Sequence, residues 1–101
     1  CEIQIDDTAA DLTEKLLQLS KNLILSVLND FEGGSVQKTP QDHSQATYVK
    51  KILSSDAEIC WKRHTALEIH NQVRAFTPKP GAWCMVEIHS IKKRVKIFAQ
   101  L

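Results

Sequence analysis

The stretch Val73–Trp83, with the sequence VRAFTPKPGAW, places Pro78, Pro80 and Gly81 within four successive positions. Proline lacks the backbone N–H that a helix needs, and glycine accepts backbone conformations that other residues avoid. A helix that reaches Phe76 therefore cannot continue past Pro78, and the chain has to turn before Trp83. This corner constrains the fold more than any other feature of the 101-residue chain.

The spacing of apolar residues changes across the corner. Before it, from about Arg63 to Phe76, apolar residues recur at helical spacing and predict a helix. After it, Ala82, Cys84, Val86 and Ile88 alternate with Trp83, Met85, Glu87 and His89, which predicts a strand. A second alternation, Val95, Ile97 and Ala99, follows the basic cluster Lys92–Lys93–Arg94, so we expect two antiparallel strands with the cluster near their tip.

The N-terminal third predicts a strand and a long helix. Residues Glu2–Ile5 alternate and indicate the end of a strand, and Thr8 with Asp11 resembles an acidic capping box. The helix that follows carries apolar residues three or four apart: Leu12, Leu16, Leu19, Leu23, Val27 and Phe31. Ser20, Lys21 and Asn22 indicate a bend or a break into two helices, and Gly33–Gly34 end the helix. Because this stripe has to pack on something, an uncovered helix predicts self-association.

The middle of the chain is predicted to contain a linker. Residues Ser35–Gln45 are polar, include Pro40 and lack periodicity, which is typical of a linker between modules. The stretch ATYVKKI that follows predicts some regained order, and AEICW predicts a short extended piece with Trp61.

Charge divides the chain in the same place. Through Gly33 there are seven acidic and two basic residues, a net of −5, and from Gly34 onward eleven basic and five acidic, a net of +6. The second half suits a polyanion, although solvated faces would give the same count. The longest apolar stretches are too short to span a membrane. Three cysteines without a close pair predict reduced thiols and a cytoplasmic protein. No signal peptide is visible, and a start at Cys1 indicates a piece of something longer.

Two Cys/His pairs invite a metal or nucleophile interpretation. Cys60 with His64 could share a helix face, whereas Cys84 and His89 lie on opposite faces of a strand. Zinc needs four converging ligands, and no sequence feature is seen that lowers a thiol pKa, so we expect neither a metal site nor a catalytic cysteine.

Aromatic and basic residues are the binding candidates. Tyr48 and Trp61 could stack on bases, but anchoring the linker is the commoner role, and Trp83 beside the turn is expected to pack. Arg74 could pair with a phosphate or with a carboxylate such as Glu58. Lys92, Lys93, Arg94 and Lys96 form the best polyanion cluster, with Lys50, Lys51, Lys62 and Arg63 behind it. The alternative for the cluster is a solvated hairpin tip.

Five short motifs occur in a characteristic order: Asp7–Thr8, Pro40–Gln41, Ala46–Ile52, Ala57–Trp61 and Val73–Trp83. In this order and spacing the chain resembles the C-terminal half of the methionyl-tRNA formyltransferase family. The resemblance implies an α+β fragment in three parts. Residues 1–34 would be the strand and long helix that end a Rossmann-like α/β formyl-transfer domain. Residues 35–47 would be a linker, and residues 48–101 a helix and hairpin that begin an OB-like tRNA-binding barrel.

The resemblance also implies the function. The family transfers a formyl group from 10-formyltetrahydrofolate to the amino group of methionine on initiator tRNA. The chain has no Asn-x-His-Pro-Ser string, so no catalytic or cofactor-binding residue is expected in it. The expected tRNA-binding residues are Lys92, Lys93, Arg94, Lys96, Arg74, Lys62 and Arg63. The alternatives are a stand-alone RNA-binding or interaction module, or a related formyltransferase.

Overall fold

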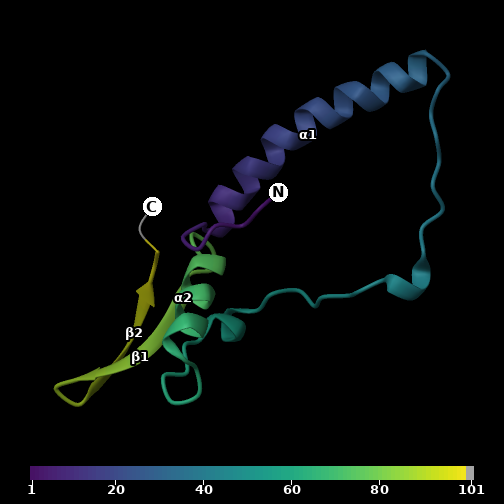
Figure 1. Ribbon diagram of the computed structural model, residues 1–101. Helices are drawn as coiled ribbons and strands as arrows, with labels where there is room; N and C mark the ends of the chain where they lie inside the picture. Colours follow the sequence, from purple (N-terminus) through teal and green to yellow (C-terminus); the bar gives the residue numbers. More distant parts are fainter. Residues whose placement is uncertain (100–101) are drawn as a thin grey trace.

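The computed structural model describes residues 1–99, so residues 100–101 of the third expected part lie outside the described residues. It contains helices α1 (Ala9–Glu32) and α2 (Ala66–Ala75) and strands β1 (Ala82–Ile88) and β2 (Ile91–Ile97). Short 3-10 turns form at His43–Gln45 and Ser54–Ala57. The two strands pair in an antiparallel sheet (Figure 1), which confirms the expected α+β class.

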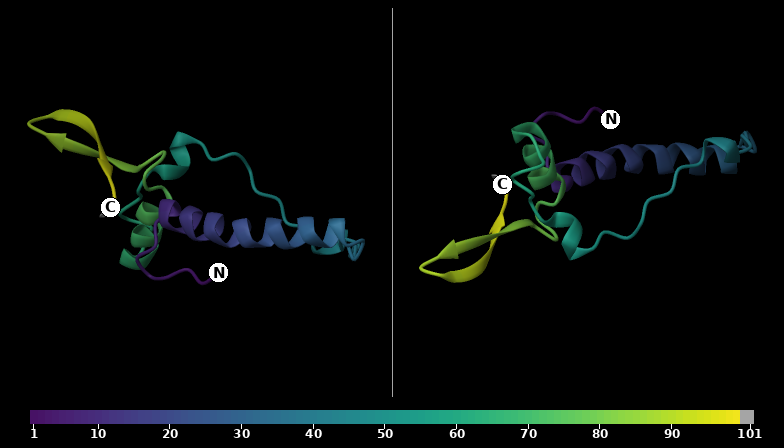
Figure 2. Two further views of the ribbon diagram at one scale, coloured as in Figure 1. Left: turned by 90° about the horizontal axis from the view of Figure 1, so that it is seen from above. Right: turned by 90° about the horizontal axis from the view of Figure 1, so that it is seen from below.

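The chain is elongated. Its radius of gyration is 19.8 Å, whereas a compact domain of 100 residues has about 13 Å. Helix α1 runs away from the rest, and the segment after it returns to α2 as a long arc (Figures 1 and 2). Residues 57–99, which hold α2 and both strands, are called the C-terminal unit below.

Helix α1 begins and ends as its sequence predicts. The Thr8 backbone N–H donates to Asp11 Oδ2 at 2.9 Å, and the Asp11 N–H donates to Thr8 Oγ1 at 3.3 Å. Gly34 takes φ = 69°, the left-handed conformation that glycine favours after a helix. The expected break near Ser20 is wrong, because the Ser20 hydroxyl donates to the Leu17 carbonyl and the helix continues.

Beyond Leu12, which is half-buried, the apolar stripe of α1 has no cover in the described part of the chain. None of the residues of α1 is buried, and Leu23 is 66% exposed. Capping and local propensity therefore define this helix, and tertiary packing does not.

The prediction of a strand at Glu2–Ile5 is wrong. These residues form an irregular segment that turns at Ile5–Asp6. A strand needs a neighbour for its backbone hydrogen bonds, and no described segment pairs with this one. The carbonyl groups of Gln4 and Ile5 instead accept hydrogen bonds from α2.

Residues 33–53 contain one 3-10 turn, started where the Asp42 carboxylate accepts from the Ser44 N–H. The order expected for ATYVKKI is absent, and Tyr48 is 92% exposed. Trp61 is also mostly exposed. The expectation that Tyr48 and Trp61 anchor the linker is therefore wrong, since neither side chain is packed into the described core.

Helix α2 begins three residues later than its apolar spacing predicts. A turn at residues 61–63 precedes it, where the N–H groups of Arg63 and His64 both donate to the Cys60 carbonyl. Thr65 then caps the helix: its N–H donates to Glu68 Oε2 at 2.7 Å, and the Glu68 N–H donates to Thr65 Oγ1 at 3.3 Å. The helix stops at Ala75, and Gly81, at φ = 84°, redirects the chain into β1.

The core lies in the C-terminal unit. Ile59, Val73, Ala82 and Cys84 are buried together, and Ile69, Val86, Ile97 and Ala99 pack against them. AEICW supplies the short extended piece that its sequence predicts, because the Ile59 N–H donates to the Trp83 carbonyl at 2.7 Å. Thr77 is fully buried: its hydroxyl donates to the Val73 carbonyl and accepts from the Ala99 N–H. Three segments distant in sequence thus close around one small core.

Candidate nucleic-acid interface

Side-chain alternation along β2 places its basic residues on two faces, and the hairpin register gives each a cross-strand partner. Residues paired across an antiparallel sheet point to the same side. Lys92, Arg94 and Lys96 pair with Glu87, Met85 and Trp83, whereas Lys93 pairs with Val86 on the side of the core. Alternate residues of one strand are about 6.6 Å apart. The first face therefore carries three cations in a row, which we call the basic stripe: Lys92, Arg94 and Lys96.

The tip of the hairpin is not basic. His89 and Ser90 form the two-residue connection, with φ of 51° and 63°. These left-handed values are typical of a type I′ turn, whose twist matches that of paired strands. Lys92, Lys93 and Arg94 belong to the first half of β2 and begin directly after Ile91, so the cluster lies close to the tip but within the paired strand.

Arg94 is already held by neighbouring groups. Its guanidinium carbon lies 3.9 Å from the centroid of the Trp83 ring, and Nη2 donates to Ser54 Oγ at 2.7 Å. Trp83 Nε1 donates to the Ser54 carbonyl at 2.7 Å, so the expected packing role of Trp83 is confirmed. Together they fasten the 3-10 turn at Ser54 to the hairpin, and the cation–π contact keeps the positive charge at the surface.

The two lysines of the stripe differ. Lys96 Nζ donates to the Pro80 carbonyl at 2.9 Å, which uses one of its three N–H groups. Lys92 is exposed and faces Glu87 across the sheet. The side chains of the stripe are cationic N–H donors, which suits binding of an anion.

Lys62 and Arg63 lie on the turn at residues 61–63, a separate element from the hairpin. Arg63 Nε donates to Cys60 Sγ at 3.2 Å. This hydrogen bond lowers the pKa of the Cys60 thiol, although partial desolvation opposes the shift. The expectation that nothing lowers a thiol pKa is therefore wrong. The sequence feature that could have predicted this shift is Arg63, three residues after Cys60.

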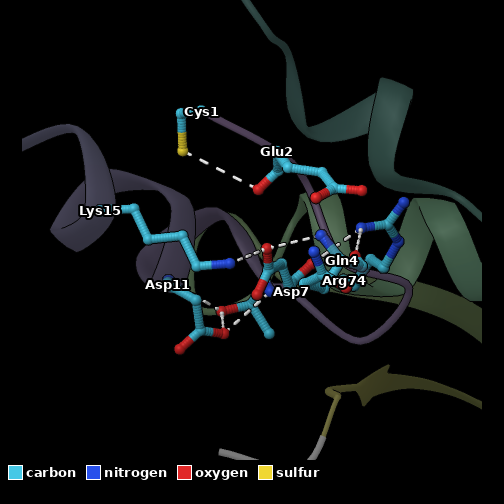
Figure 3. Close-up of polar contacts among 8 residues, drawn as sticks. Cys1, Glu2, Gln4, Asp7, Asp11, Lys15 and Arg74 are labelled. Carbon is cyan, nitrogen blue, oxygen red and sulfur yellow. Dashed lines mark hydrogen bonds and ion pairs between the residues drawn. The ribbon is translucent and has the colours of Figure 1, made fainter.

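Arg74 points to the N-terminal segment (Figure 3). Its Nη1 donates to the carbonyl groups of Gln4 and Asp7 at 3.2 and 3.0 Å, and its Nε donates to Asn71 Oδ1 at 3.0 Å. Of the two alternatives for Arg74, the pairing with Glu58 is not formed, and the phosphate contact stays a prediction. Sequence reasoning missed the contacts with Gln4 and Asp7 because their acceptors are backbone carbonyls about seventy positions away.

Residues 1–99, the part of the chain that the structure describes, lack two kinds of feature. In this range no three His, Cys, Asp or Glu side chains are grouped so that they could hold a metal ion. No helix in the same range combines the length and apolar character that a membrane crossing requires.

Known proteins resemble the chain over most of its length. Methionyl-tRNA formyltransferase of Protochlamydia amoebophila (strain UWE25) is 35% identical over 96 residues, which is 95% of the chain. The proteins of that name from Bartonella quintana (strain Toulouse) and Brucella canis are 38% and 36% identical over 91% of it. The matched region is 30% of the length of each of these three relatives.

Residues 51–100 match the family described as formyl transferase, C-terminal domain. This range contains α2, both strands and the whole basic stripe. The domain match and the relatives agree with the motif order from Asp7 to Trp83. On these matches the chain belongs to the methionyl-tRNA formyltransferase family, with its formyl transferase C-terminal domain at residues 51–100.

Proposed function

We propose that the full-length protein transfers a formyl group from 10-formyltetrahydrofolate to the amino group of Met-tRNA, for translation initiation in the cytoplasm. The name of the relatives, methionyl-tRNA formyltransferase, supports this proposal. The chain spans about 30% of their length and holds no candidate acid–base pair at its basic stripe. The folate site and the reacting groups are therefore proposed to lie in the part of the protein outside this chain.

The domain division is part of the same proposal. Residues 1–34 would end a Rossmann-like formyl-transfer domain, residues 35–47 would be the linker, and residues 48–101 would begin an OB-like barrel. The uncovered apolar stripe of α1 supports the first assignment, because such a helix needs a sheet or a second helix to cover it. The absence of regular structure over most of residues 33–53 supports the second.

The contribution we assign to this chain is to hold tRNA by its phosphates. The observation that carries it is the basic stripe, three cations on one sheet face inside the matched domain. Phosphate contacts require positive charge within reach and do not read base sequence. We assign the main contacts to Lys92 and Lys96, and supporting contacts to Lys62 and Arg63. Arg94 and Arg74 are held by protein groups, so their first role is to position neighbouring segments.

The face-specific arrangement allows a matched test. In the full-length protein, Lys92→Ala/Lys96→Ala removes two cations from the stripe. Lys93→Ala, from the opposite face of the same strand, is the control. Filter binding of initiator tRNA across a salt series measures log affinity against log salt for each variant.

The double variant should flatten this plot by about 1.4 to 1.8 units, at about 0.7 to 0.9 per phosphate contact. The Lys93→Ala slope should equal that of the wild type, and binding of the folate substrate should not change. Preference for initiator tRNA should also persist, because phosphate contacts position without specifying. Equal slopes for all three proteins would refute the interface. Failure of the wild type to formylate Met-tRNA would refute the reaction itself.

A further inference from the structure

One face of α2 lies against the turn of residues 4–7. His70 Nε2 is 2.9 Å from the Ile5 carbonyl oxygen and, because a carbonyl only accepts, donates to it. Arg74 Nη1 donates to the carbonyl oxygens of Gln4 and Asp7. His70 and Arg74 are four residues apart and thus share a helix face. We call this set of three backbone acceptors and two side-chain donors the clasp.

The turn is shaped by its own hydrogen bonds. The Gln4 N–H donates to Asp7 Oδ2 at 2.8 Å, and the Asp7 N–H donates to the Gln4 carbonyl at 3.2 Å (Figure 3). These two bonds fix the direction of the carbonyl groups that the clasp uses. The clasp therefore depends on the conformation of the turn, which the Asp7 carboxylate helps to hold.

The same turn is fastened to α1. The Asp7 carboxylate forms an ion pair with Lys15, which lies at the end of the second turn of the helix (Figure 3). This contact, followed by the Gln4 N–H, lowers the pKa of the Asp7 carboxyl and keeps it ionised. Thr8, the residue that caps α1, is only 2% exposed. The turn and the first turns of α1 thus move together.

On its other face α2 belongs to the C-terminal unit. Val73 is part of the buried core, and its carbonyl accepts the hydrogen bond of Thr77. Gln72 Nε2 donates to the carbonyl groups of Asp56 and Glu58, which ties α2 to the extended piece beside β1. Asn71 Oδ1 accepts from Arg74 Nε and so holds the guanidinium toward the turn.

We propose that Arg74, assisted by His70 and oriented by Asn71, is a positioning residue that fixes the direction of the C-terminal unit relative to α1. The basic stripe is part of that unit, so the clasp also fixes where a nucleic acid on the stripe points. The geometric part of this proposal stands by itself, whereas its catalytic consequence rests on the proposed function.

A distance measurement on the full-length protein tests the geometric part. Spin labels are placed at Asn22→Cys on α1 and Glu87→Cys on β1, both exposed, with Cys1, Cys60 and the other accessible cysteines replaced by serine. Double electron–electron resonance spectroscopy then gives the distance distribution between the two spin labels. The matched control for Arg74→Ala is Lys38→Ala, which removes the same charge from the exposed linker.

The wild type and Lys38→Ala should give one narrow distribution, and Arg74→Ala one at least about twofold wider, because a single orientation becomes several. Arg74→Lys should lie between them, since one ammonium cannot reproduce the planar fork of the guanidinium. If Arg74→Ala gives too little folded protein, Asn71→Ala replaces it, and it too should widen the distribution. An unchanged width in the alanine variant that is used overturns the clasp.

Steady-state kinetics then test the consequence. In Arg74→Ala, kcat for formyl transfer should fall about ten- to a hundredfold because the reacting groups are misplaced. The Kd for tRNA should stay within about twofold, since the stripe is intact. A proportional loss of tRNA binding, without recovery in Arg74→Lys, would overturn the positioning role. If the wild type shows no transfer, the proposed function fails while the distance measurement still decides the clasp.

Discussion

Helices α1 and α2 begin with the same capping hydrogen bonds but differ in how far they are buried. Each starts at a threonine whose hydroxyl accepts from the third residue on, and an acidic side chain there accepts from the threonine N–H. Helix α1 has 24 residues and none buried, whereas α2 has 10 and contributes Val73 to the core. Capping is therefore local and can be read from four residues, but it says nothing about what covers a helix.

The difference shows where tertiary stability resides in this chain. Around α2, segments from Ile59 to Ala99 bury one another, and buried polar groups such as Thr77 find partners. Around α1, only its first turns are tied down, through Asp7 and Thr8. Three pairs of matched substitutions, the effect of acid on the caps and amide exchange compare the two regions.

Substitution of the glycines that follow the two helices should show the largest difference in stability between the two regions. At Gly81, φ is 84° and an added Cβ would lie 2.8 Å from Phe98 Cε1, so Gly81→Ala combines backbone strain with a clash. It should destabilise the C-terminal unit by about 2–4 kcal/mol in chemical denaturation. At Gly33, φ is −76° and the nearest atom is 3.4 Å away. Gly33→Ala should therefore be neutral, or stabilising by up to about 1 kcal/mol. Similar losses at both sites would contradict the comparison.

Removal of the hydroxyl group from one threonine in each region should show the next largest difference in stability. Thr77→Val keeps the shape but leaves the Val73 carbonyl and the Ala99 N–H without their partner in a buried site. The free energy of unfolding should fall by about 1–3 kcal/mol. Thr13 on exposed α1 donates to the Ala9 carbonyl, and Thr13→Val should change stability by less than about 0.5 kcal/mol. Equal effects would mean that Thr77 is not buried in solution.

The capping threonines should behave more alike. Thr8→Ala and Thr65→Ala each remove a side-chain acceptor from a helix start and should cost about 1 kcal/mol. Circular dichroism and denaturation of both variants measure this. In the uncovered α1 the loss should appear as reduced helical signal, and in α2 as reduced stability of the C-terminal unit. A neutral Thr65→Ala would show that packing alone positions α2.

Both caps should weaken in acid. Hydrogen bonds from the Thr8 side chain and backbone lower the pKa of Asp11, and those from the Thr65 backbone and side chain lower the pKa of Glu68. A carboxyl whose pKa is lower in the folded state stabilises fully above its unfolded pKa. That contribution is lost as pH falls through the folded pKa, from about pH 5 downward. Melting temperatures between pH 7 and pH 3 should therefore fall less steeply in Glu68→Gln than in the wild type, and equal slopes would exclude this contribution.

Local signals in the sequence predicted much of the fold. The Thr8–Asp11 box, the glycines after α1, the corner at Pro78–Gly81 and the alternation in both strands all depend on neighbours a few positions away. The start of α2 was also readable, because Thr65 and Glu68 have the spacing of a capping box. The apolar period extended the predicted helix to Arg63 and obscured that signal.

Features that depend on distant partners were not predictable. Glu2–Ile5 alternates like a strand but is held by α2 through backbone carbonyls, which have no sequence signature. The cross-strand partners of Lys92 and Lys96 depend on the register, and therefore on the His89–Ser90 turn, whereas the alternation of Val95 and Ile97 already places Lys93 on the other face. Self-association through the uncovered stripe of α1 stays a prediction that sedimentation of the chain would test.

Amide hydrogen exchange of the 101-residue chain, at low and at tenfold higher concentration, tests most directly the claim that tertiary stability lies in the C-terminal unit. The Ile59, Gly81 and Ala99 N–H groups donate to the Trp83 carbonyl, the Phe76 carbonyl and the Thr77 hydroxyl respectively. At the low concentration these amides should exchange at least about tenfold more slowly than those in the middle of α1, such as Leu19 and Leu23, because an uncovered helix opens easily. Equal or stronger protection of α1 at that concentration would contradict the account.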